Sequence, residues 1–216
     1  MMEKLVQIKH QNILLEGMLR IPQSAQGIVL FAHGSGSSRL SPRNNFVANV
    51  LNEAGLATLL IDLLSKEEDL SYQTRFDIDL LTDRLNLVAQ WLKKQSHTSN
   101  LTLGIFGAST GAAAALQLAS EMNKDIGAVV SRGGRPDLAI NVLDSVAAPT
   151  LFIVGGNDFG VIELNQEAFS RLTCPKKFEI IPNATHLFEE PGCLEEVARL
   201  AKEWFCKYLN PTSLEK

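Results

Sequence analysis

The sequence predicts a single domain of the α/β class, residues 1–216, with three layers and an eight-stranded, mostly parallel sheet. Six short, mostly apolar runs are typical of strands that are covered on both faces. Segments with helical spacing of apolar residues separate these runs, and this alternation favours parallel β/α crossovers. Ahead of the first run, two segments of alternating polarity predict an antiparallel hairpin at the amino terminus.

The elements follow one another along the chain in a regular order. The hairpin comprises residues 6–10 and 13–20, which alternate apolar and polar positions around Gln11-Asn12. The six apolar runs are residues 27–32, 57–61, 101–106, 126–130, 150–154 and 177–181. Apolar stripes at helical spacing lie within residues 46–54, 81–92, 161–172 and 194–208, and residues 112–122 are rich in alanine and leucine.

Composition and charge argue against several classes of partner. The 216 residues are 45% hydrophobic and carry a formal net charge of −4, which provides no basic field for nucleic acid. The charged start of the chain does not resemble a signal peptide, and no segment is long enough to span a bilayer, so we expect a cytoplasmic protein without a membrane partner. Cys174, Cys193 and Cys206 lack metal-ligand spacing and are expected to be reduced thiols.

Ser109 is the candidate nucleophile, because residues 107–111 have the sequence G-A-S-T-G. The run 101–106 predicts a strand before this segment, and residues 112–122 predict a helix after it. Strand, serine and helix in this order form a nucleophile elbow, whose strained turn exposes the hydroxyl above the sheet. A G-x-S-x-G pentapeptide alone arises by chance in roughly one chain in fifteen of this length, so the prediction depends on its context.

His186 is the candidate base, chosen by elimination among four histidines. A serine hydroxyl is a poor nucleophile unless a base takes its proton. His10 belongs to the hairpin, His97 lies at the polar end of a helix, and His33 lies in a glycine loop that has another use. His186 directly follows the last strand, at the sheet edge where open α/β sheets bind ligands.

Asp158 is the candidate acid that would orient the imidazole, because it follows the strand at 150–154 in the sequence G-G-N-D-F-G. A simple Asx turn or a helix cap would also explain this aspartate. Asp137 and Asp144 follow the preceding strand and are competitors for the role. The choice of Asp158 gives the chain order Ser, Asp, His, which the elbow class uses.

The loop after the third strand, of sequence H-G-S-G-S-S, is expected to help stabilise a developing negative oxygen. The backbone N–H groups of Ser35 and Thr110 are the expected oxyanion donors. His33, Gly34 and Gly36 are expected to line the substrate site, because the glycines leave the backbone open. A flexible turn or a phosphate cradle are alternatives, although the loop lacks the G-K-[ST] ending of a P-loop.

These motifs, in this order and separated by β/α units, resemble those of the α/β-hydrolase superfamily over essentially the full length of the chain. They are H-G-S-G at 33–36, G-A-S-T-G at 107–111, G-N-D at 156–158 and A-T-H at 184–186. The compact size and the short segment 131–148 between strands six and seven resemble most the dienelactone-hydrolase-like branch. The enzymes that gave this branch its name use a cysteine nucleophile, whereas this chain has Ser109, so dienelactone itself is not favoured as the substrate.

The resemblance implies a serine hydrolase that forms an acyl-enzyme and needs neither a metal nor an organic cofactor. In this superfamily a lid, when present, usually interrupts the sheet between strands six and seven, and residues 131–148 are too few for a large cap. We therefore expect an open, shallow site and a small soluble ester, thioester or lactone as substrate.

Four arginines, Arg39, Arg43, Arg132 and Arg135, fall after predicted strands on the same rim as the candidate triad. Guanidinium groups suit carboxylates and phosphates, so one interpretation is an anionic substrate held by Arg39, Arg132 and Arg135. Ordinary surface charge, or pairing with Asp137 and neighbouring acids, is the other interpretation.

Other functions remain open from the sequence. Acyl transfer and peptide cleavage would use the same triad, and a non-catalytic binding protein could have the same fold. A nucleotide-dependent oxidoreductase is not favoured, because the glycines at 104, 107 and 111 do not have the G-x-G-x-x-G spacing. The sequence does not predict the physiological substrate or the oligomeric state.

Overall fold

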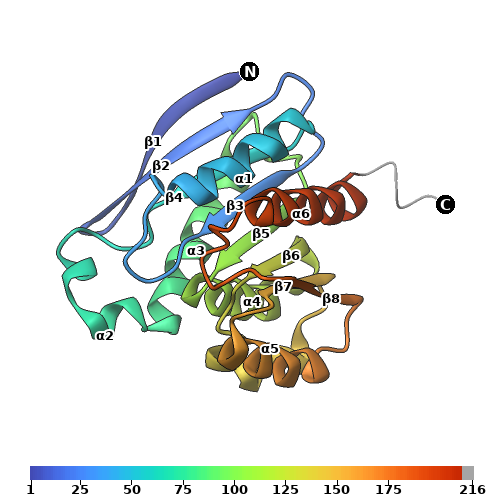
Figure 1. The fold of residues 1–216 in the computed structure, drawn as a ribbon. Helices are drawn as coiled ribbons and strands as arrows, with labels where there is room; N and C mark the ends of the chain where they lie inside the picture. The colour runs from blue at the N-terminus through green and yellow to red at the C-terminus, as the bar shows by residue number, and fades with distance from the viewer. Residues whose placement is uncertain (211–216) are drawn as a thin grey trace.

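The computed structural model describes residues 1–210 and contains the predicted eight-stranded sheet (Figure 1). The strand order is β1-β2-β4-β3-β5-β6-β7-β8. β2 pairs antiparallel with both of its neighbours, and every other neighbouring pair in the described sheet is parallel. The strands are β1 Met2–His10, β2 Ile13–Ile21, β3 Ile28–Ala32, β4 Ala57–Ile61, β5 Leu103–Ala108, β6 Ile126–Arg132, β7 Thr150–Gly155 and β8 Lys176–Ile181. The predicted hairpin and mostly parallel sheet are confirmed.

Helices cover both faces of the sheet and enclose a separate apolar core on each side (Figure 1). Two helices lie on one face, namely α1 Pro42–Glu53 and α6 Cys193–Leu209. The other face carries α3 Ile78–Lys94, α4 Thr110–Met122 and α5 Phe159–Arg171. Alternate residues of each central strand serve the two cores: in β3, Phe31 packs toward α1 and α6, and Leu30 packs toward the other face.

Local sequence signals define where the first helix begins and ends. The Ser41 hydroxyl accepts a hydrogen bond from the Asn44 N–H at 3.3 Å, and Pro42 occupies the first helical position. Gly55, with φ of 81°, then allows the left-handed turn that leads into β4. These features direct the chain between β3 and β4 and leave the loop after β3 at the carboxyl edge.

The structure corrects one expectation and adds short elements. β8 was expected to be covered on both faces, but it is an edge strand and only Ile181 in it is buried. The short helices are η1 Glu68–Leu70, α2 Tyr72–Arg75, η2 Asn123–Asp125 and η3 Pro136–Ser145. η3 is the one helical element between β6 and β7, so no large cap interrupts the described sheet.

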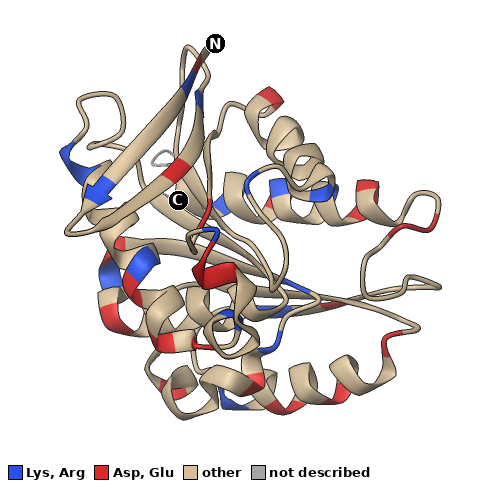
Figure 2. Ribbon diagram, turned by 90° about the vertical axis from the view of Figure 1, so that its left-hand side faces the viewer, with Lys and Arg blue, Asp and Glu red and all other residues tan. Residues whose placement is uncertain are grey.

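Charges of both signs are interspersed along the helices and loops (Figure 2). Within residues 1–210, no helix combines the length and apolar character needed to cross a membrane. The same residues contain no group of three or more potential metal ligands. Cys174, Cys193 and Cys206 are free thiols.

Candidate active site

Ser109 sits in a strained turn between the end of β5 and the start of α4. Its backbone has φ of 51° and ψ of −122°, a conformation that costs free energy for a residue with a side chain. Ser109 occupies the N-cap position of α4, yet its side chain makes no capping hydrogen bond. The hydroxyl is therefore not committed to the helix and is available for chemistry.

The two glycines of the elbow are required by close packing. A Cβ atom at Gly107 would lie 2.4 Å from Cα of Ala112, and one at Gly111 would lie 2.2 Å from the carbonyl oxygen of Ala32. Both distances are far below van der Waals contact. The pattern G-x-S-x-G thus follows from the sharp turn and from the approach of α4 to β3.

His186 and Asp158 form a hydrogen-bonded pair at the carboxyl edge. The His186 Nδ1 and Asp158 Oδ2 atoms are 2.7 Å apart, and the histidine side chain is 38% exposed. Asp158 is the N-cap residue of α5 but makes no capping hydrogen bond, so the helix-cap alternative does not describe its side chain. The carboxylate of the competitor Asp137 is instead paired with Arg135.

Direct backbone contacts hold the two loops that carry this pair against each other. The Asn157 N–H donates to the carbonyl of Ala184 at 2.9 Å, and its side-chain amide donates to the carbonyl of Asn183 at 3.0 Å. A Cβ atom at Gly155 would lie 2.4 Å from the Ala184 carbonyl oxygen, so this approach requires a glycine. The geometry of the Asp–His pair is therefore fixed by the backbone of both loops.

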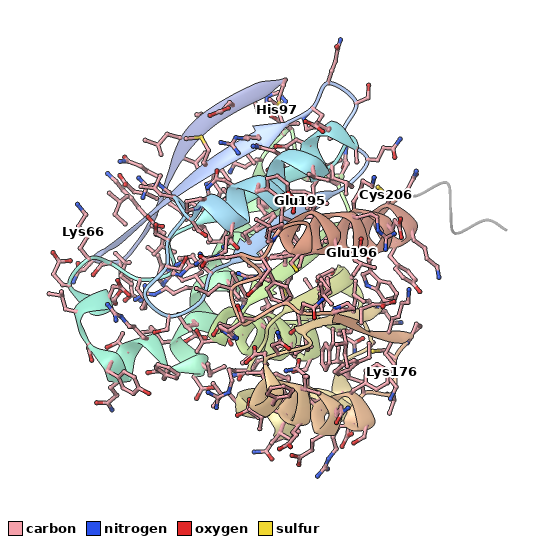
Figure 3. All side chains as sticks on the ribbon, in the orientation of Figure 1. Lys66, His97, Lys176, Glu195, Glu196 and Cys206 are labelled. Atoms are coloured by element: carbon pink, nitrogen blue, oxygen red, sulfur yellow. The ribbon has the colours of Figure 1, made fainter. Side chains whose placement is uncertain are left out.

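The loop after β6 connects the serine to the histidine. The Ser109 N–H donates to the Arg132 carbonyl at 3.3 Å, and the Arg135 N–H donates to the Ser109 carbonyl at 3.0 Å. A Cβ atom at Gly133 would lie 3.5 Å from Cε1 of His186, in ordinary contact. The end of β6 and the three-residue loop 133–135 that follows it thus contact both the serine backbone and the imidazole. His97, which the sequence analysis did not choose as the base, lies between α3 and β5. It is far from the loop after β4 that carries Lys66 (Figure 3).

The loop after β3 packs directly on the elbow. A Cβ atom at Gly34 would lie 2.9 Å from Cβ of Ser109, so only glycine fits there without a shift. The Ser35 N–H donates a hydrogen bond to the Thr110 hydroxyl oxygen at 3.0 Å. Gly36 has φ of 68°, which turns the chain away from the site. The two residues expected to provide oxyanion donors are therefore adjacent, and a side chain links them.

His33 ties two loops together. Its Nε2 accepts the Leu63 N–H at 3.0 Å, and its Nδ1–H donates to the Gly34 carbonyl at 3.0 Å. Burial lowers the pKa of His33, which favours the neutral imidazole. Both ring nitrogens are occupied by the backbone, so the ring has no free nitrogen for the substrate contact that the sequence suggested.

Three of the four rim arginines are paired with acids. Arg39 contacts Asp62 and Glu16, Arg43 lies 2.7 Å from Glu189, and Arg135 binds Asp137 through two nitrogens at 2.8 and 2.7 Å. These contacts match the sequence interpretation in which the rim arginines pair with neighbouring acids. Because these acids compensate their charges, the guanidinium groups of Arg39 and Arg135 are less available to an anionic ligand.

Arg132 differs from the other rim arginines. It is 7% exposed, and no carboxylate among residues 1–210 forms an ion pair with it. Its guanidinium lies over the Phe188 ring, 5.7 Å from the centroid. Burial, followed by the like charge of Arg43, lowers the pKa of Arg132 to about 10. A buried cation without an acid partner, next to the loop that contacts Ser109, has an unused capacity to bind an anion.

Sequence reasoning missed two features of the site. One is the Thr110 hydroxyl, since its contact with Ser35 joins residues 75 positions apart. The other is a set of large exposed apolar side chains in the loop after β3 and in the helices η1, α2 and α5 that follow β4 and β7. They are Leu40 at 69%, Leu70 at 85%, Tyr72 at 74% and Phe159 at 71%. No periodic pattern marks the segment that contains η1 and α2, so only the order of the strands could have placed it near the site.

The fold and the site match a known family. The model of the dienelactone hydrolase family matches residues 15–210. The chain belongs to the dienelactone hydrolase family. A crystal structure of dienelactone hydrolase from Anabaena variabilis is 55% identical, with a TM-score of 0.93 over 96% of this chain and 98% of that chain.

More distant structures share the same α/β-hydrolase fold. Est1E from Butyrivibrio proteoclasticus has a TM-score of 0.81 at 17% identity, over 94% of this chain and 98% of that chain.

A curated protein of Mycobacterium tuberculosis is 53% identical over 204 residues and bears the name "Putative phosphoribosyl transferase". The match covers 94% of this chain and 46% of the mycobacterial protein, so the chain spans about half the length of that relative.

Proposed function

We propose that this chain is a carboxylic ester hydrolase that cleaves small soluble esters, thioesters or lactones through an acyl-enzyme on Ser109. The observation that carries the proposal is the 2.7 Å hydrogen bond between His186 and Asp158, together with a serine in an elbow conformation; residues 132–135 contact both the serine backbone and the imidazole. A serine, a base and a group that orients the base are the parts that nucleophilic acyl transfer requires. The dienelactone hydrolase family supports the same class of reaction.

In the proposed reaction, the Ser109 oxygen attacks the substrate carbonyl carbon while His186 Nε2 takes the hydroxyl proton. Asp158 accepts the Nδ1–H, which fixes the tautomer and stabilises the imidazolium that forms. His186 then passes the proton to the leaving alkoxide or thiolate as the tetrahedral intermediate collapses. Water attacks the acyl-enzyme with His186 again as base, and the acid product and free serine are released.

The negative oxygen of each tetrahedral intermediate is proposed to bind the backbone N–H groups of Thr110 and Ser35, and the Ser35 N–H then exchanges its acceptor in the structure, the Thr110 hydroxyl, for the oxyanion. Thr110 is the first residue of α4, where backbone N–H groups have no partner within the helix and the helix dipole favours negative charge. Gly34 lets the second loop approach the serine closely. Each well-placed donor of this kind is worth about 10²- to 10³-fold in rate.

The absence of a large cap over the described sheet favours a small soluble substrate. A cavity of about 200 Å³ lies beside the loop after β3, and its lining combines Ser37 and Asp62 with Leu40 and Leu64. Neither Ser109 nor His186 lines this cavity, so it is a neighbour of the proposed site and does not define the acyl group.

Arg132 supports an anionic group on the substrate as the finer part of this proposal. The side chain is buried without an acid partner in the described chain, and its carbonyl accepts the Ser109 N–H. A carboxylate or phosphate near the scissile bond would compensate the buried charge. Arg39 and Arg135, whose guanidinium groups contact acids, contribute less to this preference.

The name of the mycobacterial relative describes phosphoribosyl transfer, and this chain matches less than half of that protein. We do not extend phosphoribosyl transfer to this chain, because a serine elbow and an Asp–His pair are suited to attack on a carbonyl carbon. Acyl transfer to an acceptor other than water would use the same residues, and product analysis distinguishes it from hydrolysis. The cytoplasmic location remains a prediction from the sequence.

The experiment that tests the proposal is labelling with a fluorophosphonate, followed by a panel of short acyl esters, thioesters and lactones. We expect the wild-type protein to be labelled and to hydrolyse members of the panel, and Ser109→Ala to do neither. Ser170→Ala is the matched control, since this serine is exposed near the end of α5 and bonds only the Glu167 carbonyl. Labelling or turnover that persists in a folded Ser109→Ala protein would overturn the assignment.

A further inference from the structure

We propose that Asn165, in α5, is a positioning residue for the reaction: its side-chain amide holds the loop that contacts both Ser109 and His186. This inference rests on the proposed function and concerns a fully buried residue, which does not contact the substrate. It depends on two hydrogen bonds that Asn165 Nδ2 donates, one to the Gly134 carbonyl at 2.9 Å and one to the Val161 carbonyl at 2.8 Å.

The loop after β6 receives the first of these bonds, and its backbone contacts both the nucleophile and the base. The Arg132 carbonyl accepts the Ser109 N–H at 3.3 Å, and the Arg135 N–H donates to the Ser109 carbonyl at 3.0 Å. A Cβ atom at Gly133 would lie 3.5 Å from Cε1 of His186. A shift of this loop would therefore change the position of the serine relative to the imidazole.

This loop needs an external restraint, because two consecutive glycines form its first part. Gly133 has φ of 51°, and a glycine backbone must give up many accessible conformations to become ordered. The Gly133 N–H donates to the Ile153 carbonyl at 2.8 Å, which anchors the loop to β7. Within residues 1–210, Asn165 is the one side chain that donates a hydrogen bond to either glycine. It therefore anchors the loop to the helix layer.

The position of Asn165 within α5 connects this loop to the acid as well. Asp158 is the N-cap residue of α5, and Asn165 follows it by about two helical turns. The start of the helix is bonded to His186 through Asp158. Its middle is bonded, through Asn165, to the loop that contacts Ser109 and His186. One helix thus links the acid, the base and the nucleophile.

The burial of this amide is not explained by the needs of the helix. The Val161 carbonyl is already an acceptor for the backbone N–H one turn later in an α-helix, so the side chain is not required there. Asn165 Oδ1 is buried and has no hydrogen-bond partner within residues 1–210. A buried polar atom without a partner lowers stability. The bond to the Gly134 carbonyl is therefore the contact that favours an asparagine at this position.

The test separates the two bonds of the amide. In Asn165→Thr the hydroxyl can donate to the Val161 carbonyl, as the Thr82 hydroxyl does to the Ile78 carbonyl at 2.8 Å, and its single proton cannot also serve Gly134. On an ester that the wild type hydrolyses, we expect kcat to fall by about 10- to 100-fold, because a misplacement of about 1 Å costs up to about 10²-fold. KM should stay within about threefold. Asn165→Leu, which removes both bonds, should lose no more activity than Asn165→Thr.

Two further measurements distinguish positioning from a merely structural role. The value of kcat is expressed per serine titrated by the fluorophosphonate, so that misfolded molecules do not count. The rate constant of labelling should fall by about the same factor as kcat, because labelling needs the same base. The NMR resonance of the proton between His186 Nδ1 and Asp158 should remain in Asn165→Thr, since backbone contacts fix this pair.

Asn52→Leu is the matched control, because Asn52 is also a buried helical asparagine whose amide bonds to the protein. Its Nδ2 donates to the Leu56 carbonyl at 2.9 Å and to the Thr58 hydroxyl at 3.1 Å, and neither partner belongs to the proposed site. This variant should lower the melting temperature and keep the wild-type kcat per titrated serine.

Several results would overturn the inference. A wild-type kcat in Asn165→Thr would show that the bond to Gly134 is unnecessary. Fewer titrated serines, each with the wild-type kcat, would assign Asn165 a structural role alone, and loss of the His186 resonance would place the effect on the Asp–His pair. If Asn165→Thr does not fold, Asn165→Ser makes the same comparison with a smaller hydroxyl residue. A wild type without serine-dependent hydrolysis would instead refute the proposed function.

Discussion

Two histidines at the carboxyl edge of the same sheet have opposite environments. His33, after β3, is buried and gives both ring nitrogens to the backbone. His186, after β8, is partly exposed and gives one ring nitrogen to Asp158. An imidazole with both nitrogens bonded to the backbone cannot accept a substrate proton without breaking a structural bond. A position at the sheet edge is therefore not enough for a histidine to act as a base. A base also needs one free ring nitrogen, while a hydrogen bond at the other ring nitrogen holds the ring in a fixed orientation.

Arg39 and Arg132 repeat this difference between the two sides of the site, whereas Arg135, also after β6, is paired with Asp137. On the β3–β4 side, Arg39 contacts Asp62 and Glu16, so its charge is compensated within the protein. On the β6–β8 side, Arg132 is buried with no carboxylate partner in the described residues. We infer that the β3–β4 side is a fixed support. On the β6–β8 side, the second ring nitrogen of His186 and the charge of Arg132 remain available to a substrate.

The largest expected effect separates the two histidines. His186→Ala should lower kcat by about 10⁴- to 10⁶-fold with little change in the melting temperature, because the ring acts on the proton and packs on the surface of the site. His33→Ala should behave in the opposite way and lower the free energy of unfolding by about 1–3 kcal/mol, because it leaves the Leu63 N–H without its acceptor. Ester hydrolysis and thermal unfolding of both variants check this contrast.

His97→Ala is the control for this pair, since His97 is exposed in the turn after α3. It should leave both the rate and the melting temperature unchanged. A full loss of activity in His33→Ala without loss of stability, or an active His186→Ala, would reverse the assignment of the two sides.

A smaller effect, opposite in sign between the two sides, is expected at the arginines. Arg132→Met should raise the free energy of unfolding by roughly 2 kcal/mol, because it removes a buried and unpaired charge. Arg39→Met should lower the free energy of unfolding by about 1–3 kcal/mol, because Asp62 loses its partner. Arg132→Met should also lower kcat/KM for esters that carry a carboxylate while neutral esters react as before.

Denaturant unfolding and paired kinetics on an acidic and a neutral ester measure both effects. Destabilisation by Arg132→Met would mean that the charge has a structural partner. Equal losses on the two esters would remove the anionic substrate from the proposal and leave the hydrolase itself untouched.

Much of this arrangement could be predicted from the sequence, because it depends on local patterns. The alternation of apolar runs and helical stripes predicts the parallel sheet, and the glycines at 107 and 111 mark the places where α4 meets β5 and β3. Strand order then brings Ser109, Asp158 and His186 to one edge, since each follows a parallel strand. The sequence excludes His33 as the base because this residue lies in a glycine loop. The hydrogen bonds of its two ring nitrogens to the backbone are seen only in the structure.

The features that the sequence did not predict depend on distances between distant segments. The lack of an acid beside Arg132 is a property of everything that packs around it, and no spacing in the chain encodes it. The hydrogen bond from the Ser35 N–H to the Thr110 hydroxyl forms only because the loop after β3 packs on the elbow, and it joins residues 75 positions apart. The run 177–181 was expected to form an inner strand, but the position of β8 in the strand order makes it an edge, where the charged side chains of Lys177 and Glu179 are tolerated.

The smallest expected effect is a pH dependence that belongs to the β3–β4 side. Burial lowers the pKa of His33 from its usual value of 6.5, so below that pH the unfolded chain binds a proton that the folded protein resists. The contribution of neutral His33 to stability is complete above pH 6.5 and is lost as the pH falls toward the folded-state pKa. The free energy of unfolding should therefore decrease from pH 7.5 to 5.5, and part of this slope should come from His33.

The variant His33→Gln isolates that part, because an amide does not titrate in this range and can still hydrogen-bond to the backbone. Its unfolding free energy should depend less steeply on pH between 7.5 and 5.5 than that of the wild type, measured by urea unfolding at each pH. His97→Ala is the control and should keep the wild-type slope, since His97 is exposed in the turn after α3. Parallel pH profiles for the wild type and His33→Gln would mean that His33 accepts a proton in the folded protein, and the support on the β3–β4 side would then be less fixed than its hydrogen bonds indicate.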